Sequence, residues 1–475
     1  MFHRRPTSYR KPFRANWRVY QDSLLQTGNK KRLILKRIRH AIILPLLAVL
    51  LYFGIAALGN SAGGRHRPEN QQSTGPLQTF HMWKDSDSIS KADIRAGIDS
   101  DQMLNLTTRT LNFDHAGGKF NAATSIDIDL QEYMLSRMDW RSPRYIPRYL
   151  GIIVMDPATG RVLSMAGFDR DNKTGNPCIM GKFPAASIFK IVTAAAAVET
   201  CDLKPESRLT FNGGKYTLYK SQIKEKTNKY TNRILFKDSF AQSVNPVFGK
   251  LGALSIGKNT LEKYALAFGF NREIGFEIPV APSRVHLADD PYQWAEIACG
   301  FNRDTTLSPL HGAMLVSAVV NHGILIEPSI VDRVFDDQGK TVYVNHPVII
   351  HQAIKPRTSA LIMEMMQTTV KSGTCRKAFR GLKRDSVLAR LTIGGKTGSI
   401  YNRQRDARFD WFVGFAADKQ TTAKIAVAVV VGHGEYIGVR ASQYARLAMK
   451  EYFGSYFSKS KNTVNAHAQP VKAKG

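Results

Sequence analysis

Pro184-Ala-Ala-Ser187-Ile-Phe-Lys190 opens an apolar, alanine-rich run that continues to residue 198. This run is apolar on every side, which predicts a buried central helix rather than an amphipathic surface helix. Ser187 would lie in its first turn, where free backbone N–H groups and the positive end of the helix dipole favour developing negative charge. Ser187 and Lys190 are three residues apart, so their side chains would project from the same face.

The order of three motifs singles out Ser187 from the other serines of the chain. The pattern Ser-x-x-Lys occurs six times, but only at Ser187 does an apolar helical run follow. Ser243-Val-Asn245 comes 56 residues later, and Lys396-Thr-Gly-Ser399 begins 151 residues after Asn245. Acyl transfer by a serine of this kind needs groups from separate parts of the fold to meet in one cleft. The ordered set therefore predicts such a cleft.

With these motifs in order, residues 126–455 resemble the penicillin-binding, serine acyltransferase family. Three further segments carry the resemblance: 153–167 is similar to the first strand pair of the family, 307–323 to a helix after the second motif, and 411–415 to the strand after the third. One departure is Ser399, where many relatives carry threonine, and it keeps the hydroxyl. The resemblance implies a monofunctional transpeptidase domain.

The fold class predicted is α+β: an antiparallel sheet flanked by the terminal helices, with a helical lobe inserted in the middle. Strands are expected near both ends of the domain, and the first pair flanks a turn, Asp156 to Gly160, whose Pro and Gly suit a tight reversal. The expected strands are 149–155, 161–167, 391–400, 409–415 and 423–432, and a helix is expected over 442–457. The resemblance implies the same arrangement.

Ser187 is the predicted nucleophile, and neutral Lys190 is the predicted base. A lysine can take the serine proton only if its pKa falls from about 10.4, and burial and a second cation are the means. Lys190 lies in an apolar helix, and Lys396 would approach from a strand across the cleft. Ser243 is then the expected proton relay to a leaving amine, and Asn245 would hold both Lys190 and a substrate amide. An alternative for the last two is structural, with Ser243 as a helix N-cap and Asn245 as a turn residue.

The third motif is expected to bind the end of a peptide. Lys396 and the hydroxyls of Thr397 and Ser399 suit a terminal carboxylate, and Gly398 would let a substrate backbone approach the strand. The backbone N–H groups of Ser187 and Ser399 are the candidates for the oxyanion hole.

The substrate comes from the resemblance, which implies a peptidoglycan stem peptide ending in D-Ala-D-Ala and inhibition by beta-lactams. Ser187 would release the last D-Ala, and an amine on a neighbouring stem would resolve the acyl-enzyme into a crosslink. A D,D-carboxypeptidase would use the same residues with water as acceptor. A beta-lactamase would need a deacylating group, commonly a glutamate, for which no segment stands out. A non-catalytic beta-lactam sensor or wall scaffold is the alternative from another class. A membrane glycan polymerase or another wall-synthesis protein is an expected partner, although the N-terminal region that often serves such a pairing in relatives is short or absent.

The ends of the chain predict a membrane anchor. Residues 1–40 hold twelve Lys or Arg against the single acid Asp22, and residues 41–58 are 18 residues without a charge. A basic leader marks the cytoplasmic side, and the apolar run is close to the ~20 residues that cross a bilayer. A cleaved signal peptide is the alternative, but this leader is long for one. Residues 59–125 are expected to form a tether and a small appendage, 126–457 the catalytic domain, and 458–475 a disordered tail.

The net charge of +29 does not require a nucleic-acid partner. Eleven of these charges belong to the leader, where they would hold the anionic inner leaflet. No recognition-helix signature or basic-aromatic interleaving supports nucleic-acid binding. The expected location is the inner membrane, with one span and the catalytic domain on the extracytoplasmic side.

Four cysteines, Cys178, Cys201, Cys299 and Cys375, fall in the segment expected to be exported. Three disulfide pairings are open to them, including a Cys178–Cys201 bridge that would staple the nucleophile helix, but buried free thiols are the favoured interpretation. No cysteine has the spacing of a metal ligand, and no metal or cofactor is predicted.

Overall fold

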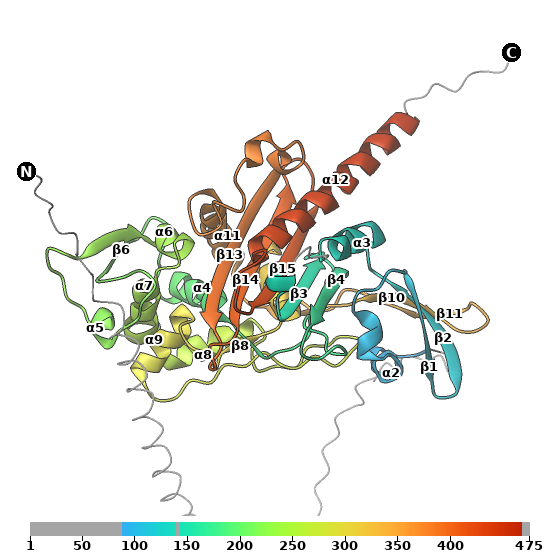
Figure 1. Ribbon diagram of the computed structural model, residues 1–475, viewed down its shortest axis with the longest axis horizontal. Helices are drawn as coiled ribbons and strands as arrows, with labels where there is room; N and C mark the ends of the chain where they lie inside the picture. The colour runs from blue at the N-terminus through green and yellow to red at the C-terminus, as the bar shows by residue number, and fades with distance from the viewer. Residues whose placement is uncertain (1–87, 139–142, 468–475) are drawn as a thin grey trace, which may run out of the picture. The chain divides into compact units, whose positions relative to one another are not determined.

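The computed structural model describes residues 88–138 and 143–467, coloured by position in Figure 1. The predicted leader, the membrane span 41–58 and the first part of the tether lie outside these residues. Within the described ranges, no helix combines the length and the apolar character that a membrane crossing requires.

The centre of the domain is a five-stranded antiparallel sheet in the order β13-β14-β15-β3-β4. Its strands are β3 (Tyr149–Met155), β4 (Val162–Asp169), β13 (Leu391–Tyr401), β14 (Arg408–Asp418) and β15 (Lys424–His433). All five were predicted, with ends that differ by no more than three residues. The α+β class with an inserted helical lobe is confirmed. Because β13 is an edge strand, one side of its backbone is left without a partner strand.

Helices cover both faces of the sheet, which is why β15 carries an almost unbroken apolar run. On one face, α3 (Ile128–Ser136) and α12 (Ala441–His467) pack on a cluster around Val427 and Val429. On the other face lie α10 (Pro309–Val320) and α11 (Pro356–Lys371). Each buried face removes apolar surface from water and contributes to folding in proportion to its area.

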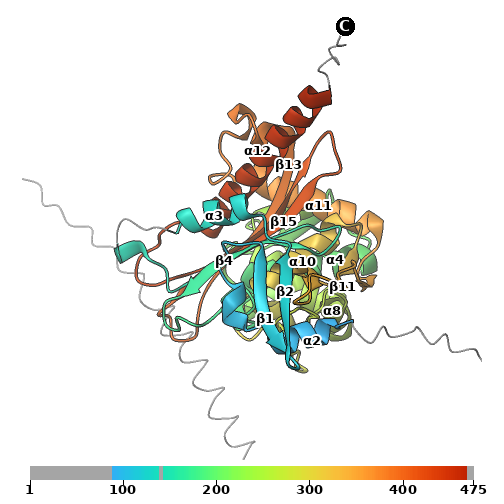
Figure 2. The same ribbon diagram turned by 90° about the vertical axis from the view of Figure 1, so that its right-hand side faces the viewer.

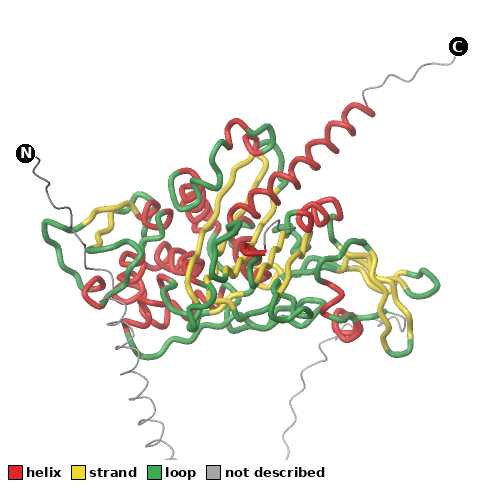
Figure 3. The backbone as a smooth tube through the Cα atoms, viewed as in Figure 1, coloured by secondary structure: helices red, strands yellow, loops and turns green. Residues whose placement is uncertain are grey.

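The helical lobe lies between β4 and β13 in the sequence, and Figure 3 shows its helices grouped on one side of the sheet. Residues 190–197 are all buried, so the predicted central helix is present. It begins differently from the prediction, because Ser187 lies in a 3-10 turn, η3 (Ala186–Phe189), before α4 (Lys190–Thr200). The other helices of the lobe are α5 (Lys220–Ile223), α6 (Phe236–Ala241), α7 (Asn245–Lys250), the π-helix η4 (Leu251–Ile256), α8 (Gly257–Ala267) and α9 (Pro291–Cys299).

Three pairs of short strands complete the connections. They are β5 (Phe183–Pro184) with β8 (Thr306–Leu307), β6 (Arg208–Phe211) with β7 (Asn232–Leu235), and β9 (Ile324–Ile326) with β12 (Ile349–Gln352). Short 3-10 turns are η1 (Ser100–Met103), η2 (Pro143–Tyr145), η5 (Leu382–Arg384) and η6 (Leu388–Arg390).

Residues 88–124, predicted as the end of a tether and small appendage, are integrated into the domain. Helix α2 (Lys91–Gly97) leads to the hairpin of β1 (Thr110–His115) and β2 (Gly118–Thr124). Strand β2 pairs with β10 (Val331–Phe335), which pairs with β11 (Thr341–Val344), giving a four-stranded sheet (Figure 2). A pairing across about two hundred residues leaves no local signal in the sequence.

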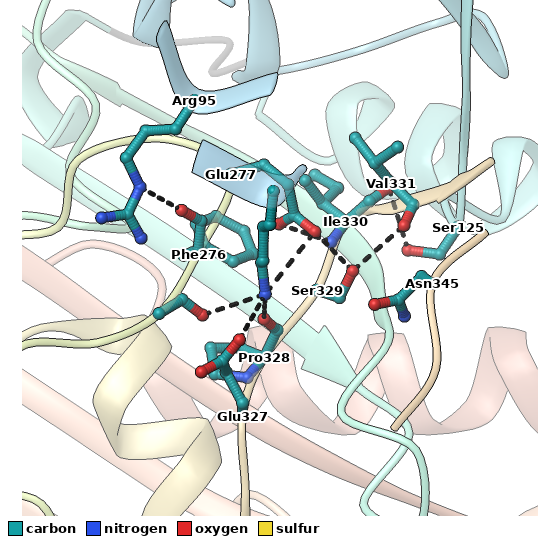
Figure 4. A network of polar contacts seen from close by, with 12 residues as sticks. Arg95, Ser125, Phe276, Glu277, Glu327, Pro328, Ser329, Ile330, Val331 and Asn345 are labelled. Carbon is teal, nitrogen blue, oxygen red and sulfur yellow. Dashed lines mark hydrogen bonds and ion pairs between the residues drawn. The ribbon is translucent and has the colours of Figure 1, made fainter. Parts of the chain in front are cut away.

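A buried carboxylate fastens this N-terminal segment to the domain. Glu277 is fully buried and accepts hydrogen bonds from Ser329 Oγ (2.5 Å) and the backbone N–H of Ile330 (3.1 Å), as Figure 4 shows. Lys91 Nζ, from α2, lies 3.8 Å from Glu277 and 2.8 Å from Glu327. Burial raises the pKa of Glu277, and Lys91 opposes this effect. Lys91 is thus the main compensating charge for a carboxylate that water does not reach.

One prediction at another position was wrong. Helix α12 continues to His467, ten residues into the tail 458–475 predicted to be disordered, since neither Pro nor Gly interrupts the chain between Gly454 and Pro470. All four cysteines are free thiols, which was the favoured alternative to a Cys178–Cys201 bridge, although Cys201 is only partly buried. Cys178 is buried, with its Sγ 3.5 Å from the carbonyl oxygens of Ile152 and Ala166.

Removing Lys91 should destabilise the domain. We expect Lys91→Ala to lower the free energy of unfolding by about 3–5 kcal/mol, because it leaves the Glu277 carboxylate buried without its partner. Thermal unfolding of the Lys91→Ala, Glu277→Gln and double variants measures the coupling. Lys119→Ala, at an exposed lysine of the same segment, is the control. Equal losses from Lys91→Ala with and without Glu277→Gln would show that the pair does not interact.

Candidate active site

The nucleophile turn is held in an unusual backbone conformation by close contacts with two glycines. Ala186, directly before Ser187, has a φ of +50°, a region that residues other than glycine seldom adopt. A Cβ at Gly300 would come within 2.2 Å of Ala186 C and 2.8 Å of Ser187 N. A Cβ at Gly398 would lie 3.3 Å from Ser187 N. A side chain at Gly300 would not fit without moving the backbone of the turn, and one at Gly398 would make a tight contact, so the two glycines let α9 and β13 approach the turn closely.

Lys190 is the centre of the polar contacts around Ser187. Its Nζ lies 2.8 Å from Ser187 Oγ, 2.8 Å from Asn245 Oδ1 and 2.5 Å from the carbonyl oxygen of Cys299. Its side chain is fully buried, and burial lowers its pKa to about 8. An ammonium can donate to all three partners, whereas a neutral amine can donate to two of them and accept from the Ser187 hydroxyl. The proton can therefore move between Ser187 and Lys190 without any side chain changing position.

Lys396, the second buried amine, contacts Ser243 of the second motif. Its Nζ lies 3.0 Å from Ser243 Oγ and 2.8 Å from the carbonyl oxygen of Thr397. Burial lowers the pKa of Lys396 well below its ordinary value, and Lys190 lowers it further. Each amine in this buried site therefore makes a positive charge on the other less favourable.

The Ser243-Val244-Asn245 segment links two short helices of the lobe. Ser243 has a φ of +57° just after α6 ends, and Asn245 opens α7. The alternative in which Ser243 is a helix N-cap was wrong. The N-cap residue of α7 is Val244, and this cap has no side-chain hydrogen bond. The backbone N–H of Asn245 donates to the carbonyl oxygen of Lys215 (2.7 Å), which fixes this segment from behind.

Strand β13 brings the third motif to the same place. Thr397, Gly398 and Ser399 line a groove of about 750 Å³ that Ser187, Ser243 and Asn245 also line. Within it, the hydroxyls of Thr397 and Thr374 lie 2.5 Å apart. The structure thus brings together all eight residues predicted from the sequence. Gly398 differs from its expected role, since it faces the Ser187 turn rather than serving only the approach of a substrate.

Sequence reasoning missed four contributors to the site. The Cys299 carbonyl and Gly300 come from the end of α9, Thr374 follows α11, and Arg408 Nε donates to Ser399 Oγ (3.0 Å). Gly300 ends its helix with a φ of +67°, a feature that Cys-Gly after a helical run could have suggested. The other contributions depend on tertiary contacts. Residues 88–138 and 143–467 contain no group of three or more His, Cys, Asp or Glu side chains that could hold a metal ion.

The groove thus contains a serine hydroxyl beside a buried lysine amine, a second serine–lysine pair and an edge strand. This arrangement is that of a serine acyltransferase of the Ser-x-x-Lys type. Residues 150–450 match the family described as the penicillin binding protein transpeptidase domain. The chain belongs to this family.

Individual relatives are distant. Stage V sporulation protein D of Bacillus subtilis is 26% identical over 326 residues, covering 64% of this chain and 49% of that protein. Peptidoglycan D,D-transpeptidase PbpA of Mycolicibacterium smegmatis is 24% identical over 323 residues, covering 60% of this chain and 62% of that protein. The chain spans about half the length of the first and less than two thirds of the second.

Solved structures share the fold. Penicillin-binding protein A from M. tuberculosis, solved as its imipenem acyl-enzyme complex, superposes with a TM-score of 0.57 at 21% identity. The match covers 70% of this chain and 79% of that one. At this identity the likeness supports the arrangement of elements.

Gly300→Ala should impair the site without unfolding the domain. A Cβ there would collide with the backbone of Ala186, displace Ser187 and slow its acylation by penicillin about 10²-fold, the usual result of a misplacement near 1 Å. Gly339→Ala is the matched control, since Gly339 has a φ of +80° but open space around it. Equal acylation rates in the two variants would contradict the proposed contact.

The acylation rate should depend on the protonation of Lys190. Because burial lowers its pKa to about 8, the neutral base is scarce below that pH and abundant above it. The second-order rate constant for labelling Ser187 with a fluorescent penicillin should rise about tenfold per pH unit up to pH 7 and level off above pH 9. A flat profile from pH 6 to 10, or a midpoint near 10.5, would contradict Lys190 as the base.

Proposed function

We propose that this protein is a peptidoglycan D,D-transpeptidase that crosslinks stem peptides through an acyl-enzyme on Ser187 and is inhibited covalently by beta-lactams. The observation that carries the proposal is the contact of Ser187 Oγ with the buried amine of Lys190 at 2.8 Å. Family membership and the names of its relatives support the reaction class. The imipenem acyl-enzyme complex of the M. tuberculosis protein supports covalent inhibition by beta-lactams.

Acylation begins when Ser187 Oγ attacks the carbonyl carbon of the penultimate D-Ala and its proton passes to neutral Lys190. Backbone N–H groups of Ser187 and Ser399 donate to the oxyanion that forms. The C–N bond then breaks, and the leaving D-Ala takes a proton from the Ser243 hydroxyl. Lys396, whose Nζ lies 3.0 Å from Ser243 Oγ, replaces that proton. Lys190 has gained one proton and Lys396 has lost one, so the two amines together still carry a single positive charge.

Deacylation reverses these transfers. An acceptor amine attacks the ester carbonyl and gives its proton through Ser243 to Lys396. Lys190 returns its own proton to Ser187 Oγ as the ester bond breaks, which regenerates the starting state. The lowered pKa of each lysine favours this exchange, because neither amine holds its proton as tightly as it would in water.

The free edge of β13 suits a peptide that binds as an added strand. Thr397 and Ser399 offer hydroxyls to its terminal carboxylate, and Arg408, held against Ser399, adds a positive charge. Asn245 uses Oδ1 for Lys190, and its Nδ2 makes no hydrogen bond within the described residues, so that amide is available to a substrate carbonyl.

The membrane anchor and location belong to the same proposal. The basic leader and the uncharged run 41–58 support a single span with the catalytic domain on the extracytoplasmic side, where peptidoglycan is found. Other wall-synthesis proteins, including a membrane glycan polymerase, remain predicted partners.

Labelling by a fluorescent penicillin tests the acyl-enzyme. We expect the full chain, purified in detergent, to be labelled on Ser187 for many minutes, and the Ser187→Ala variant to remain unlabelled. Rapid loss of the label would indicate a beta-lactamase, and no label on folded protein would favour a scaffold.

Incubation with a D-Ala-D-Ala stem peptide and an acceptor amine then tests the reaction. A crosslinked product is expected from the wild type, and release of D-Ala by water alone would contradict the transpeptidase assignment in favour of a carboxypeptidase.

A further inference from the structure

A second pocket lies behind the Ser243–Asn245 segment, between the β6–β7 hairpin and helix α6. It has a volume of about 490 Å³ and is lined by three cations, Arg208, Lys215 and Arg233, with Asp238 as the acid among its lining residues. We call it the hairpin pocket. Its apolar lining residues are Phe211, Ile234 and Leu235, and none of its lining residues has a role in the mechanism above.

Two of its arginines are placed together by the strand register. Thr210 of β6 lies opposite Arg233 of β7, and Arg208, two residues before Thr210, shares its face of the hairpin. Both arginines are exposed and make no hydrogen bond or ion pair within the described residues. Like charges on one face of a strand pair repel each other, so an anion between them would be stabilised.

The other charged groups around the pocket do not cancel its excess of positive charge. Lys215 Nζ donates to Gln242 Oε1 (2.6 Å), and Lys250 Nζ donates to the carbonyl oxygen of Thr210 (3.2 Å). Both partners are neutral, so both ammonium charges persist. Asp238 can offset one of the four positive charges. The local field therefore favours an anion, and guanidinium pairs bind carboxylates with good geometry.

The hairpin pocket shares a wall with the catalytic groove. Lys215 lines the pocket and Tyr216 lines the groove, and likewise Gln242 lines the pocket and Ser243 the groove. The same wall carries the hydrogen bond from the N–H of Asn245 to the carbonyl oxygen of Lys215. The two cavities therefore lie on either side of the Lys215–Tyr216 and Gln242–Ser243 segments.

We propose that the hairpin pocket binds an internal carboxylate of the stem peptide whose D-alanyl end occupies the groove, with Arg208 and Arg233 as its ligands. This assignment rests on the proposed function, because it takes the groove ligand to be a stem peptide. Under this proposal the two arginines determine specificity. They favour a donor stem peptide whose internal carboxylate is free over one in which that group is a carboxamide.

Competition against penicillin tests the pocket without requiring turnover. Two stem pentapeptides, alike except for a free or amidated internal carboxylate, compete with a fluorescent penicillin for Ser187 of the full chain in detergent. We expect the free acid to compete about tenfold better, as one charge-assisted contact would give. Arg208→Gln/Arg233→Gln should abolish this advantage and leave the penicillin labelling rate unchanged.

The control is Arg109→Gln/Arg333→Gln, which removes two exposed arginines, one directly before β1 and one in β10, and should keep the advantage. Loss of the advantage in both double variants, or its persistence in Arg208→Gln/Arg233→Gln, would overturn the proposal. If that variant is not labelled because it fails to fold, Arg208→Lys/Arg233→Lys replaces it, with a reduced advantage expected because the paired contact is lost.

A separate arm distinguishes a free anion from the peptide. If inorganic phosphate raises the Tm of the wild type but not of Arg208→Gln/Arg233→Gln, while the free acid has no advantage over the amide, the pocket serves a free anion and the peptide assignment is wrong. Failure of the proposed function has a different signature, since the wild type would then be labelled by penicillin yet form no crosslink.

Discussion

The burial of two lysine amines, Lys190 and Lys396, is the constraint on which the rest of the structure depends. Neither side chain is exposed to solvent, and a charged amine removed from water is costly unless acceptors surround it. The acceptors come from separate parts of the chain: the Ser187 turn, the start of α7, the end of α9 and strand β13. The helical lobe and the sheet must therefore pack against each other around these amines, and the catalytic groove lies where they do so. The same burial that makes the amines expensive lowers their pKa values and makes them useful as proton carriers.

Close packing of backbone against backbone makes this convergence possible. The turn at Ala186 and the link at Ser243 both have positive φ values, a strain that isolated peptides would release. Gly300 and Gly398 allow α9 and β13 to press against the nucleophile turn, and their neighbours keep it in place. Strain held by surrounding structure pre-organises the groups, so little reorganisation is required when charge develops in the transition state. The integrated N-terminal segment, tied down by Lys91 and Glu277, extends the domain beyond the part that carries the chemistry.

Much of this could be predicted from the sequence because the signals were local. The run after Ser187 indicated a buried helix, the apolar strands of the sheet had the expected lengths, and the order of three short motifs predicted the eight residues that line or support the groove. The parts that escaped prediction have no local signal. The Cys299 carbonyl is a backbone atom whose importance depends on where α9 ends, and Arg408 reaches Ser399 only because β14 pairs with β13. The pairing of β2 with β10 likewise depends on segments far apart in the chain. A count of charges likewise does not place Arg208 and Arg233 on one face of the β6–β7 hairpin.

The charge state of Lys190 is the central claim, and it can be measured directly. Lysine labelled with ¹⁵N at Nζ would be incorporated into the full chain, with the signal of Lys190 assigned by its loss in Lys190→Met, and followed by NMR as the pH is raised. The account predicts a midpoint near pH 8 in the free protein, well below the ordinary value for lysine, because of burial. A midpoint near 10.5 in both the free and the penicillin-acylated protein would contradict it, since Lys190 could not then take the proton of Ser187.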